Sequence, residues 1–551
     1  MPTEEYYKKF KEEADEYTDA VVKIDHSKKL VVAGPGTGKS TLFRKICENN
    51  VKSGKKKNIV LSFINELVAD LKKDLHQLAE VSTLHSFALK ELQKTPAKGQ
   101  GFFMKITDVI NKDYEILNKN KIDFGKIICN LINDPDKLEF YESRRQYYNH
   151  FGPNCSVYTL IKYYEDDNEK IPEYDQLLVD EFQDFNKMEI AFIDFLASKS
   201  NLLIVGDDDQ SLYSFRYADP SEIRSRHSLD SHKKFKLPFC FRCTEVTVNA
   251  FNNVVERAKS EGFLKQRIDD KEYKYFPTKE KDEISGKNQQ IIVKEKVFDT
   301  SVAFHIDKKI KDIFDSGEMK FSVLIITPLP NQAIKIKNDL TKKGFTDIQI
   351  SYKGKDNINR DLLDGLGLLL ENYDCNLGWR IVAEQVLKEE DFKKIIKKSC
   401  SDKNNFKSLM DRSVIQSIEF LLTTIKSIKE GKTVTEEGYE RLFKATGYDC
   451  NKITSEKLLN ELEKYFPKNN IHKNTPIKIT NILGSKGLTK DYVFLVNFDD
   501  KYLIGDKNKI TDEKICNFLV SLTRAKKKVY IFSQKTPTFA EWIDAKFIKK
   551  E

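Results

Sequence analysis

Short apolar runs rich in β-branched residues alternate with amphipathic helical patterns over the first part of the chain. The segments 28–34 (KKLVVAG) and 58–63 (NIVLSF) predict buried strands, and each is followed by a segment with helical spacing. Two further strands are predicted at 175–181 (DQLLVDE) and 201–207 (NLLIVGD), separated by the helical pattern of 188–198. This alternation predicts a parallel sheet with helices on both faces.

A second stretch with the same alternation begins near residue 237. The segments 321–328 (FSVLIITP), 491–498 (DYVFLVNF) and 528–533 (KVYIFS) predict three more buried strands. Two long blocks with helical patterns and no clear strands interrupt these cores. The sequence therefore predicts an α/β protein with two parallel-sheet cores, each carrying a mostly helical insertion. The boundaries are 1–101 and 166–236 for the first core, 102–165 for its insertion, 237–354 and 476–551 for the second core, and 355–475 for a reduced insertion in that core.

Composition limits the class of protein without selecting a function. With 551 residues the chain is too long for one core, and 40% hydrophobic with 32% charged residues describes a soluble globular protein. No apolar run is long enough to span a membrane, and the N-terminus lacks the apolar core of a signal peptide. We therefore expect a cytoplasmic protein with no membrane partner. The net charge of +8, from 93 basic and 85 acidic residues, permits nucleic-acid binding without establishing it.

The nine cysteines are scattered along the chain, which is typical of a reducing compartment with unpaired thiols. The close pair Cys240 and Cys243, in PFCFRC, has no second pair nearby and so does not predict a zinc site. The lysine-rich and acidic segment 265–290 predicts a surface loop or a mobile linker.

A glycine-rich turn follows the first predicted strand. In VVAGPGTGKST, Val31 to Thr41, the glycines let successive backbone N–H groups surround a phosphate at the positive end of a helix. Lys39 can reach the β- and γ-phosphates, and the Ser40 hydroxyl can ligate Mg²⁺. The position that usually opens this pattern with glycine is Ala33. The predicted nucleotide-binding residues are Ala33, Gly34, Pro35, Gly36, Thr37, Gly38, Lys39, Ser40 and Thr41.

Adjacent carboxylates follow another predicted strand, in LLVDEFQD, Leu177 to Asp184. Asp180 is expected to hold Mg²⁺, and Glu181 to orient and deprotonate the attacking water. A strand that ends in Asp-Glu is common in isolation, and it is usually only a solvated loop. Together with the phosphate loop it favours hydrolysis of a bound nucleotide over simple binding.

The stretch VGDDDQSLYSFRYA, Val205 to Ala218, places three aspartates and a glutamine directly after a predicted buried strand. Two aromatic residues, Tyr213 and Phe215, come shortly afterwards. In such a polar segment we expect neither the charges nor the rings to belong to the core. The two ends of the loop are therefore predicted to serve two different ligands.

These segments, taken in order with five others, resemble the UvrD/Rep/PcrA group of superfamily 1 helicases. A single short match could be accidental, but seven in the expected order, beside the phosphate loop, cover most of the chain. The resemblance implies two RecA-like P-loop cores, ATP and Mg²⁺ as cofactors, and single-stranded DNA or a junction with duplex as the partner. The other five segments are LSFINELVADL (61–71), STLHSF (82–87), LPFCFRC (237–243), NILGSKGL (481–488) and FLVSLTRAKKKVYIF (518–532).

The resemblance also implies roles for individual residues. Gln210 would sense the γ-phosphate, while Tyr213 and Phe215 would stack on unpaired bases, each stack being worth about 1–3 kcal/mol. Arg242 and Arg524, both in the second core, would stabilise charge on the γ-phosphate when the cleft closes. Packing into an adjacent domain is the alternative for either ring, and a surface salt bridge is the alternative for Arg524. The remaining assignments are Phe241, Lys486 and Gly487 for the nucleotide, and Phe63, Asn65, Thr83, His85, Ser86 and Phe87 for DNA.

The chain departs from the family pattern at several positions. Tyr17 stands where family members carry a glutamine that reads the adenine edge. In the segment 481–489, Leu483 replaces a histidine and Thr489 replaces a glutamate. The insertion in the second core is also smaller than in family enzymes. These departures affect three expected properties: selectivity for adenine, coupling between nucleotide and DNA, and unwinding without a partner.

Two functions fit these patterns. The first is an ATP-driven translocase or helicase that moves 3′ to 5′ on single-stranded DNA, a direction implied by the resemblance. The second is a nucleotide-gated DNA sensor that serves as a subunit beside a nuclease, as in compact UvrD-like subunits of phage-defence systems. An unrelated P-loop enzyme would use Lys39 but leave Gln210, Tyr213 and Arg524 without a role. RNA as the track is not excluded by the residues.

Overall fold

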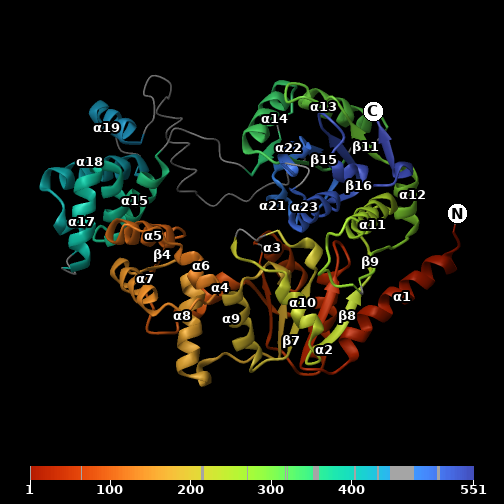
Figure 1. Cartoon of the computed structure of the whole chain (residues 1–551), viewed down its shortest axis with the longest axis horizontal. Helices are drawn as coiled ribbons and strands as arrows, with labels where there is room; N and C mark the ends of the chain where they lie inside the picture. The colour runs from red at the N-terminus through yellow and green to blue at the C-terminus, as the bar shows by residue number, and fades with distance from the viewer. Residues whose placement is uncertain are drawn as a thin grey trace. The chain divides into compact units, whose positions relative to one another are not determined.

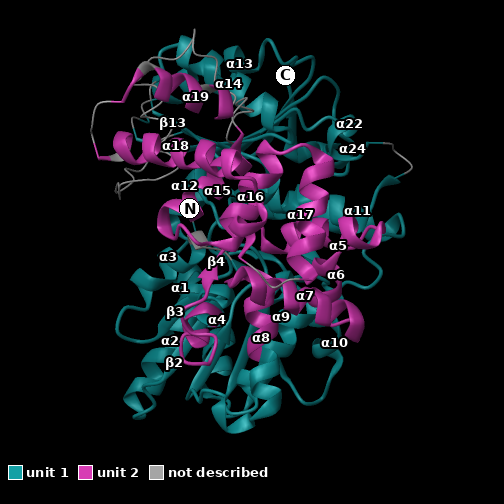
Figure 2. Ribbon diagram, turned by 90° about the vertical axis from the view of Figure 1, so that its left-hand side faces the viewer, with its two compact units in different colours: residues 1–87, 161–354, 474–551 teal, residues 88–160, 355–473 magenta. Residues whose placement is uncertain are grey.

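The computed structural model divides the chain into two compact units (Figures 1 and 2). Unit 1 comprises residues 1–87, 161–354 and 474–551, and unit 2 comprises residues 88–160 and 355–473. The residues that the structure describes are 2–63, 65–212, 216–269, 271–316, 318, 320–345, 347–351, 359–401, 405–430, 434–446, 477–505 and 509–551.

The first sheet of unit 1 has six strands in the order β3-β2-β6-β7-β1-β8, and every neighbouring pair is parallel. Because the strands are parallel, their carboxyl ends meet at one edge, where ligands bind in sheets of this kind. The strands are β1 (Lys28–Ala33), β2 (Asn58–Ser62), β3 (Glu80–Thr83), β6 (Gln176–Val179), β7 (Leu202–Gly206) and β8 (Lys233–Leu237). The accompanying helices are α1 (Glu4–Lys23), α2 (Lys39–Lys52), α3 (Asn65–Asp74), α4 (Leu84–Leu92), α9 (Lys187–Ala197) and α10 (Ser221–Ser228).

Continuous apolar runs explain why β1, β2 and β7 are interior strands of this sheet. Val31 pairs with Val205 on one side and with Phe235 on the other, and the strands β2 and β7 are buried at every position. A strand covered by helices on both faces needs apolar residues without alternation, as these strands have.

The second sheet of unit 1 has seven parallel strands in the order β13-β14-β12-β15-β16-β11-β17. Its presence confirms the predicted α/β fold with two RecA-like lobes. The strands are β11 (Ile291–Lys294), β12 (Val323–Ile326), β13 (Ile348–Ile350), β14 (Ile477–Thr480), β15 (Lys490–Val496), β16 (Ala525–Phe532) and β17 (Ile548–Lys550). The helices are α11 (Glu245–Ser260), α12 (Lys279–Lys287), α13 (Val302–Asp315), α14 (Pro330–Lys342), α21 (Ile482–Ser485), α22 (Asp500–Leu503), α23 (Asp512–Leu522) and α24 (Thr538–Glu541).

The segment 265–290 is not the surface loop or mobile linker that its composition predicts. It contains helix α12 and the short strand β10 (Lys274–Tyr275), which pairs with β9 (Phe239–Cys240). Arg267 and Tyr273 are buried, and the Lys271 side chain is 6% exposed. The prediction failed because the charges of this segment have buried partners of opposite sign that lie about 60 residues earlier in the sequence.

Unit 2 is mostly helical and brings the two predicted insertions together. The insertion predicted at 102–165 also contributes to a two-residue parallel pair, β4 (Gly101–Phe102) with β5 (His150–Phe151), which its helical pattern does not indicate. The helices are α5 (Ile106–Asn118), α6 (Phe124–Cys129), α7 (Pro135–Tyr148), α8 (Pro153–Asp166), α15 (Arg360–Glu371), α16 (Asn376–Val386), α17 (Glu389–Ser401), α18 (Arg412–Lys429) and α19 (Glu436–Thr446). Searched over the described residues of both units, the helices include none that combines the length and the apolarity needed to cross a membrane.

Candidate functional site

A cavity of about 700 Å³ lies between the two lobes of unit 1. Its wall carries the phosphate loop and the carboxylates from the first lobe, and two arginines from the second. The predicted site residues that line it are Pro35, Gly36, Thr37, Gly38, Lys39, Ser40, Thr41, Asp180, Glu181, Gln210, Phe241, Arg242, Gly487 and Arg524. These residues come from six separate stretches of the sequence, and the fold brings them together in one wall.

The phosphate loop connects the end of β1 to the start of α2, and its glycines are needed for two reasons. Gly36 and Gly38 have φ angles of +73° and +88°, which residues with a side chain rarely adopt. A Cβ atom on Gly36 would also lie 2.5 Å from the Arg242 Cβ of the second lobe, and one on Gly34 would lie 3.0 Å from the Tyr273 ring. Ala33 is the last residue of β1 and is fully buried, so it supports the loop without lining the cavity.

Lys39 and Glu181 are joined directly. The Lys39 Nζ lies 2.7 Å from Glu181 Oε1, and both side chains are largely buried. Burial alone would lower the pKa of the lysine, but the charges of Glu181 and Asp180 outweigh this effect and raise it. Burial would raise the pKa of Glu181, whereas Lys39 and Lys486 hold it well below its ordinary value. Glu181 is therefore a weak base while it binds Lys39.

The backbone of Glu181 is in the left-handed region, at a φ of 53°. For a residue with a side chain this conformation is strained by about 1–3 kcal/mol, and such strain concentrates at functional sites. Gln183 Nε2 donates to Glu181 Oε2 over 2.7 Å, so the carboxylate is held from both sides.

Lys486 contacts the residues around Glu181 but does not line the cavity. Its Nζ lies 2.6 Å from Asp184 Oδ2, 3.8 Å from Glu181 Oε2 and 2.5 Å from the carbonyl oxygen of Gln210. Lys486 comes from the second lobe, and all three partners come from the first. The residue predicted to bind nucleotide therefore lies where it can relay a change between the lobes, while its neighbour Gly487 lines the cavity.

Asp180 and Ser40 offer the oxygen ligands that Mg²⁺ prefers. Both line the cavity, Ser40 at the beginning of α2 and Asp180 directly after β6. Burial, reinforced by the charge of Glu181, raises the pKa of Asp180 to about 7 in spite of Lys39. Within the described part of the chain, no lysine or arginine forms an ion pair with Asp180, so this carboxylate fits a bound cation.

Arg242 and Arg524 approach the cavity side by side. Arg242 Nη1 donates to the Thr523 carbonyl at 3.4 Å, and Arg524 Nε donates to the Val520 carbonyl at 2.8 Å. Burial and the nearby charge of Arg242 lower the pKa of Arg524 to about 10, so it remains protonated at neutral pH. Two guanidinium groups held this close provide a site for a highly charged anion.

An aromatic corner and helix α1 form another part of the wall. The Phe241 ring is 44% exposed and lies 4.4 Å from the Phe276 ring, centroid to centroid. Asp15 and Thr18 of α1 also line the cavity. Tyr17, which occupies the expected position of the adenine-reading glutamine, instead packs against Phe239 and does not line the cavity.

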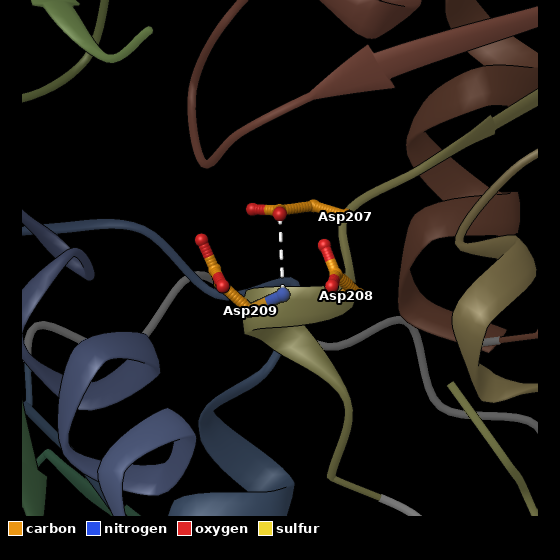
Figure 3. A group of neighbouring side chains, drawn as sticks. All are labelled: Asp207, Asp208 and Asp209. Carbon is orange, nitrogen blue, oxygen red and sulfur yellow. Dashed lines mark hydrogen bonds between the residues drawn. The ribbon is translucent and has the colours of Figure 1, made fainter. Parts of the chain in front are cut away.

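The three aspartates after β7 are buried, contrary to the prediction that this end of the loop lies outside the core. Figure 3 shows Asp207, Asp208 and Asp209 gathered at one point. Their carboxylates are close enough to hold a metal ion. The ammonium group of Lys271 already occupies this role, since its Nζ lies 2.8, 2.5 and 2.7 Å from the three carboxylates in turn. Arg224 and Arg267 add charge-assisted bonds to Asp208 and Asp209.

This buried cluster also holds Gln210. Its Nε2 donates to Asp207 Oδ2 over 2.9 Å, and the other oxygen of Asp207 accepts from Lys271. Lys271 belongs to the second lobe, whereas Gln210 and Asp207 belong to the first. Lys271 of the second lobe thus holds Gln210, the expected γ-phosphate sensor, in place through Asp207.

The predicted DNA-contact residues fall into two groups. Phe63, His85 and Ser86 are at least partly accessible, at the carboxyl ends of β2 and β3. The Arg216 guanidinium lies 4.9 Å from the centre of the Phe63 ring. Burial and this charge lower the pKa of His85 to about 4, so its ring is neutral at physiological pH. Its Nε2 lies 3.2 Å from Glu189 Oε1 without hydrogen-bond geometry.

The second group, Thr83 and Phe87, stabilises the first lobe by packing and helix capping. Phe87 is 1% exposed and packs against Tyr174 and Phe192, so its ring cannot reach a base in this conformation. Thr83 is buried and caps α4, accepting from the Ser86 N–H at 3.2 Å. The T-x-H-S-F resemblance does not distinguish these packing positions from surface ones. Asn65 begins α3, and its side chain is outside the described residues, as are Tyr213 and Phe215.

Several site residues have no signal in the sequence. Thr489 was recognised only as a departure, yet it lines the cavity. Lys271, Arg267 and Arg224 meet the aspartates through tertiary contacts, and Arg216 was not distinguished from its neighbours. The cavity also includes Lys11, Ala14, Asp15, Thr18, Lys45, Leu67, Phe276 and Lys526.

Comparison with known proteins agrees with this geometry. Residues 18–216 match a family model described as an AAA domain, AAA_19. The ATP-dependent DNA helicase PcrA of Staphylococcus epidermidis is 24% identical over 509 residues, which cover 81% of this chain and 64% of the relative. PcrA of Staphylococcus aureus is 23% identical over 511 residues, with coverage of 80% and 64%. A probable DNA helicase II homolog of Mycoplasma capricolum is 25% identical over 386 residues, with coverage of 60% and 50%.

The chain spans less than two thirds of the length of these curated relatives. The alignments with the two staphylococcal proteins nevertheless extend over both lobes, as do the ordered motifs. Motifs, fold and relatives together support a likeness to the UvrD/PcrA-type helicases of superfamily 1.

Proposed function

We propose that the chain hydrolyses ATP to move along single-stranded DNA, as a translocase or a 3′ to 5′ helicase in the cytoplasm. The observation that carries this proposal is the shared cavity, which places Lys39, Asp180 and Glu181 of one lobe opposite Arg242 and Arg524 of the other. Hydrolysis at such a site depends on the distance between the lobes, so it can drive their relative motion.

The contacts of Lys39 suggest how nucleotide activates the site. In this structure Lys39 and Glu181 bind each other. A triphosphate would draw Lys39 to its β- and γ-oxygens, so that the Glu181 carboxylate becomes available to orient and deprotonate water. Mg²⁺ held by Ser40 and Asp180 would neutralise charge on the phosphate oxygens. Arg242 and Arg524 would then stabilise the charge that develops on the transferred group, an effect worth about 10³–10⁵ in rate for an arginine finger.

The loop that begins at Gln210 connects the cavity to the residues proposed to contact DNA. Gln210 is followed within a few residues by Arg216, which lies against Phe63. We assign DNA contacts to Phe63, His85, Ser86 and Arg216, and on the resemblance alone to Asn65, Tyr213 and Phe215. A strand bound there would be gripped or released as Gln210 responds to the γ-phosphate.

ATPase measurements test this proposal. The wild-type chain should hydrolyse ATP faster with single-stranded DNA, and Lys39→Ala should abolish turnover while DNA binding persists, because Lys39 is the phosphate ligand. Lys52→Ala, at the exposed end of the same helix α2, is the matched control and should retain turnover. Turnover that ignores single-stranded DNA would refute the motor, and normal turnover in Lys39→Ala would refute the assignment of the phosphate loop.

The second candidate is a nucleotide-gated DNA sensor that acts beside a nuclease. Thr489 favours it, because it lines the cavity where the family resemblance predicts a glutamate. Co-purification with a stoichiometric nuclease, together with little strand displacement by the isolated chain, would support the sensor over the motor.

A further inference from the structure

Two cysteines flank the residues through which the second lobe faces the nucleotide. The order is Cys240, Phe241, Arg242 and Cys243, so the thiols enclose the aromatic residue and one arginine of the cavity wall. Both cysteines are fully buried. The Cys243 N–H donates to the Cys240 Sγ at 3.3 Å. A tight turn therefore holds the sulfurs next to each other.

The same pair connects the phosphate loop to the arginine segment. The Tyr273 hydroxyl lies 3.0 Å from Cys240 Sγ and 2.8 Å from the Pro35 carbonyl oxygen. A Cβ atom on Gly36 would lie 3.4 Å from the Cys240 sulfur. On the other side, Cys243 Sγ contacts the carbonyl oxygen of Thr523, which also accepts from Arg242.

The two thiols differ in acidity. Burial alone would raise the pKa of Cys240, but the hydrogen bond from Cys243, the Lys281 ammonium and the Tyr273 hydroxyl lower it to about 5. The hydrogen bond to Cys240 and burial hold the pKa of Cys243 well above its ordinary value. A low-pKa thiolate beside a protonated thiol is the arrangement of an attacking and a resolving cysteine.

We propose that Cys240 and Cys243 form a reversible redox pair, whose disulfide inactivates the nucleotide site by displacing Phe241 and Arg242. The consequence for turnover rests on the proposed ATPase function, whereas formation of the disulfide does not.

The oxidant is a peroxide, with hydrogen peroxide as the probe. The Cys240 thiolate attacks one peroxide oxygen, the O–O bond breaks, and a sulfenic acid and hydroxide result. The Cys243 sulfur then attacks the Cys240 sulfur, the S–O bond breaks, and the Cys243 proton leaves with the displaced oxygen as water. Two thiols lose two electrons in total, and the peroxide is reduced to water. A dithiol reverses the reaction.

Disulfide formation changes the local geometry. The two sulfurs must approach to about 2.05 Å, with a fixed dihedral angle about the new bond. The backbone of Phe241 and Arg242 lies within the closed ring, and the Phe241 N–H is bonded to the Gly36 carbonyl at 2.8 Å. The arginine and the aromatic ring therefore cannot keep their places when the ring closes.

The experiment treats the full-length protein with hydrogen peroxide, removes the oxidant and follows two readouts. Mass spectrometry should find the peptides of Cys240 and Cys243 joined, with a loss of two hydrogens that dithiothreitol reverses. DNA-stimulated turnover and binding of a fluorescent ATP analogue should each fall by roughly tenfold or more, part of the effect of losing an arginine finger.

Two variants serve as controls. Cys243→Ser keeps a hydrogen-bonding group but cannot form the bond, so its turnover should resist peroxide. Cys400→Ser removes an exposed thiol elsewhere and should respond like wild type. The proposal is overturned if Cys400 is oxidised while no Cys240–Cys243 bond forms, or if the bond forms and nucleotide binding is unchanged. Because mass and nucleotide binding do not require turnover, failure of the motor function would be recognised separately.

Discussion

At the scale of single residues, the neighbouring groups decide the pKa and the binding partner of each carboxylate. Asp180 and Glu181 are adjacent carboxylates, yet burial raises the pKa of the first, and lysines lower that of the second. The aspartates 207–209 resemble a metal site, but a lysine from the other lobe binds all three. The functional meaning of a carboxylate therefore depends on which cation the fold brings to it.

Replacing Lys271 tests the tether of Gln210. Lys271→Met should lower the free energy of unfolding by about 3–5 kcal/mol, because it leaves buried carboxylates without their main partner. It should also lower the kcat of the ATPase more than it changes the KM for ATP, since Asp207 loses the cation that fixes it against Gln210.

Kinetics and thermal unfolding of Lys271→Met measure both effects. The control is Lys274→Met on the same segment, whose side chain is 44% exposed and pairs with Glu272 at the surface. Loss of stability with an unchanged kcat in Lys271→Met would show that the aspartate cluster is structural only. Lys271→Arg should restore part of the rate.

At the scale of elements, a buried ion cluster joins the two insertions into unit 2. Asp113 of α5 binds Arg144 of α7 at 2.7 Å and Arg380 of α16 at 2.9 Å, and all three are buried. The Tyr148 hydroxyl donates to the same carboxylate. Residues from both insertions thus share one buried carboxylate within unit 2.

Removing this carboxylate should destabilise unit 2. Asp113→Ala should lower the free energy of unfolding by about 3–5 kcal/mol, because two buried guanidinium groups lose their counterion. Asp361→Ala removes an exposed salt bridge to Lys105 between the same two insertions and should change stability by no more than about 1 kcal/mol. Denaturant unfolding of the full chain measures both, and equal effects would contradict a central role for Asp113.

The pH dependence has a definite sign. Burial would raise the pKa of Asp113, but Arg380 and Arg144 outweigh it and lower the pKa below its ordinary value of 3.8. The unfolded state therefore binds the proton more readily, so this stabilisation is present above pH 3.8 and is lost as the pH falls through the folded pKa. Acid unfolding of Asp113→Ala should be less steep than that of wild type in this range.

At the scale of the whole molecule, the relation between the lobes determines whether the chain is a motor. Both sheets are parallel, and both present loops to one cavity, so a single nucleotide can contact both. Lys486 and Lys271 of the second lobe also bind carboxylates of the first directly. Under the proposed function, opening of the cleft would break these ion pairs and so link nucleotide state to lobe position.

Strand displacement distinguishes a motor from a sensor. On tailed duplexes with ATP, a 3′ to 5′ helicase should release the strand from a substrate with a 3′ tail faster than from one with a 5′ tail. The same substrates without ATP are the control. DNA binding should weaken with salt, at a logarithmic slope of about −0.7 per phosphate contact for single strands. DNA-stimulated ATPase without displacement from either substrate would restrict the activity to translocation or sensing.

Much of the fold was predictable because it depends on local patterns. Continuous apolar runs located the central strands of both sheets, and turn chemistry located the phosphate loop. The short pair of β4 and β5 was not predictable, since two residues carry no periodicity. The sequence did not predict that segment 265–290 is partly buried, because its many charged residues are typical of a solvent-exposed loop. Two of these charges instead pair with aspartates of the first lobe.

The sequence by itself determined the chemistry available to this protein: a phosphate loop, adjacent carboxylates, a glutamine and two arginines in a recognisable order. These features depend on residue type and short spacing, which a linear chain records. Only the tertiary structure decided that Lys39 binds Glu181, that Lys271 binds the three aspartates, and that Cys240 and Cys243 lie between the phosphate loop and Arg524. Such contacts join residues tens to hundreds of positions apart, and they depend on burial and distance, which spacing along a chain does not encode.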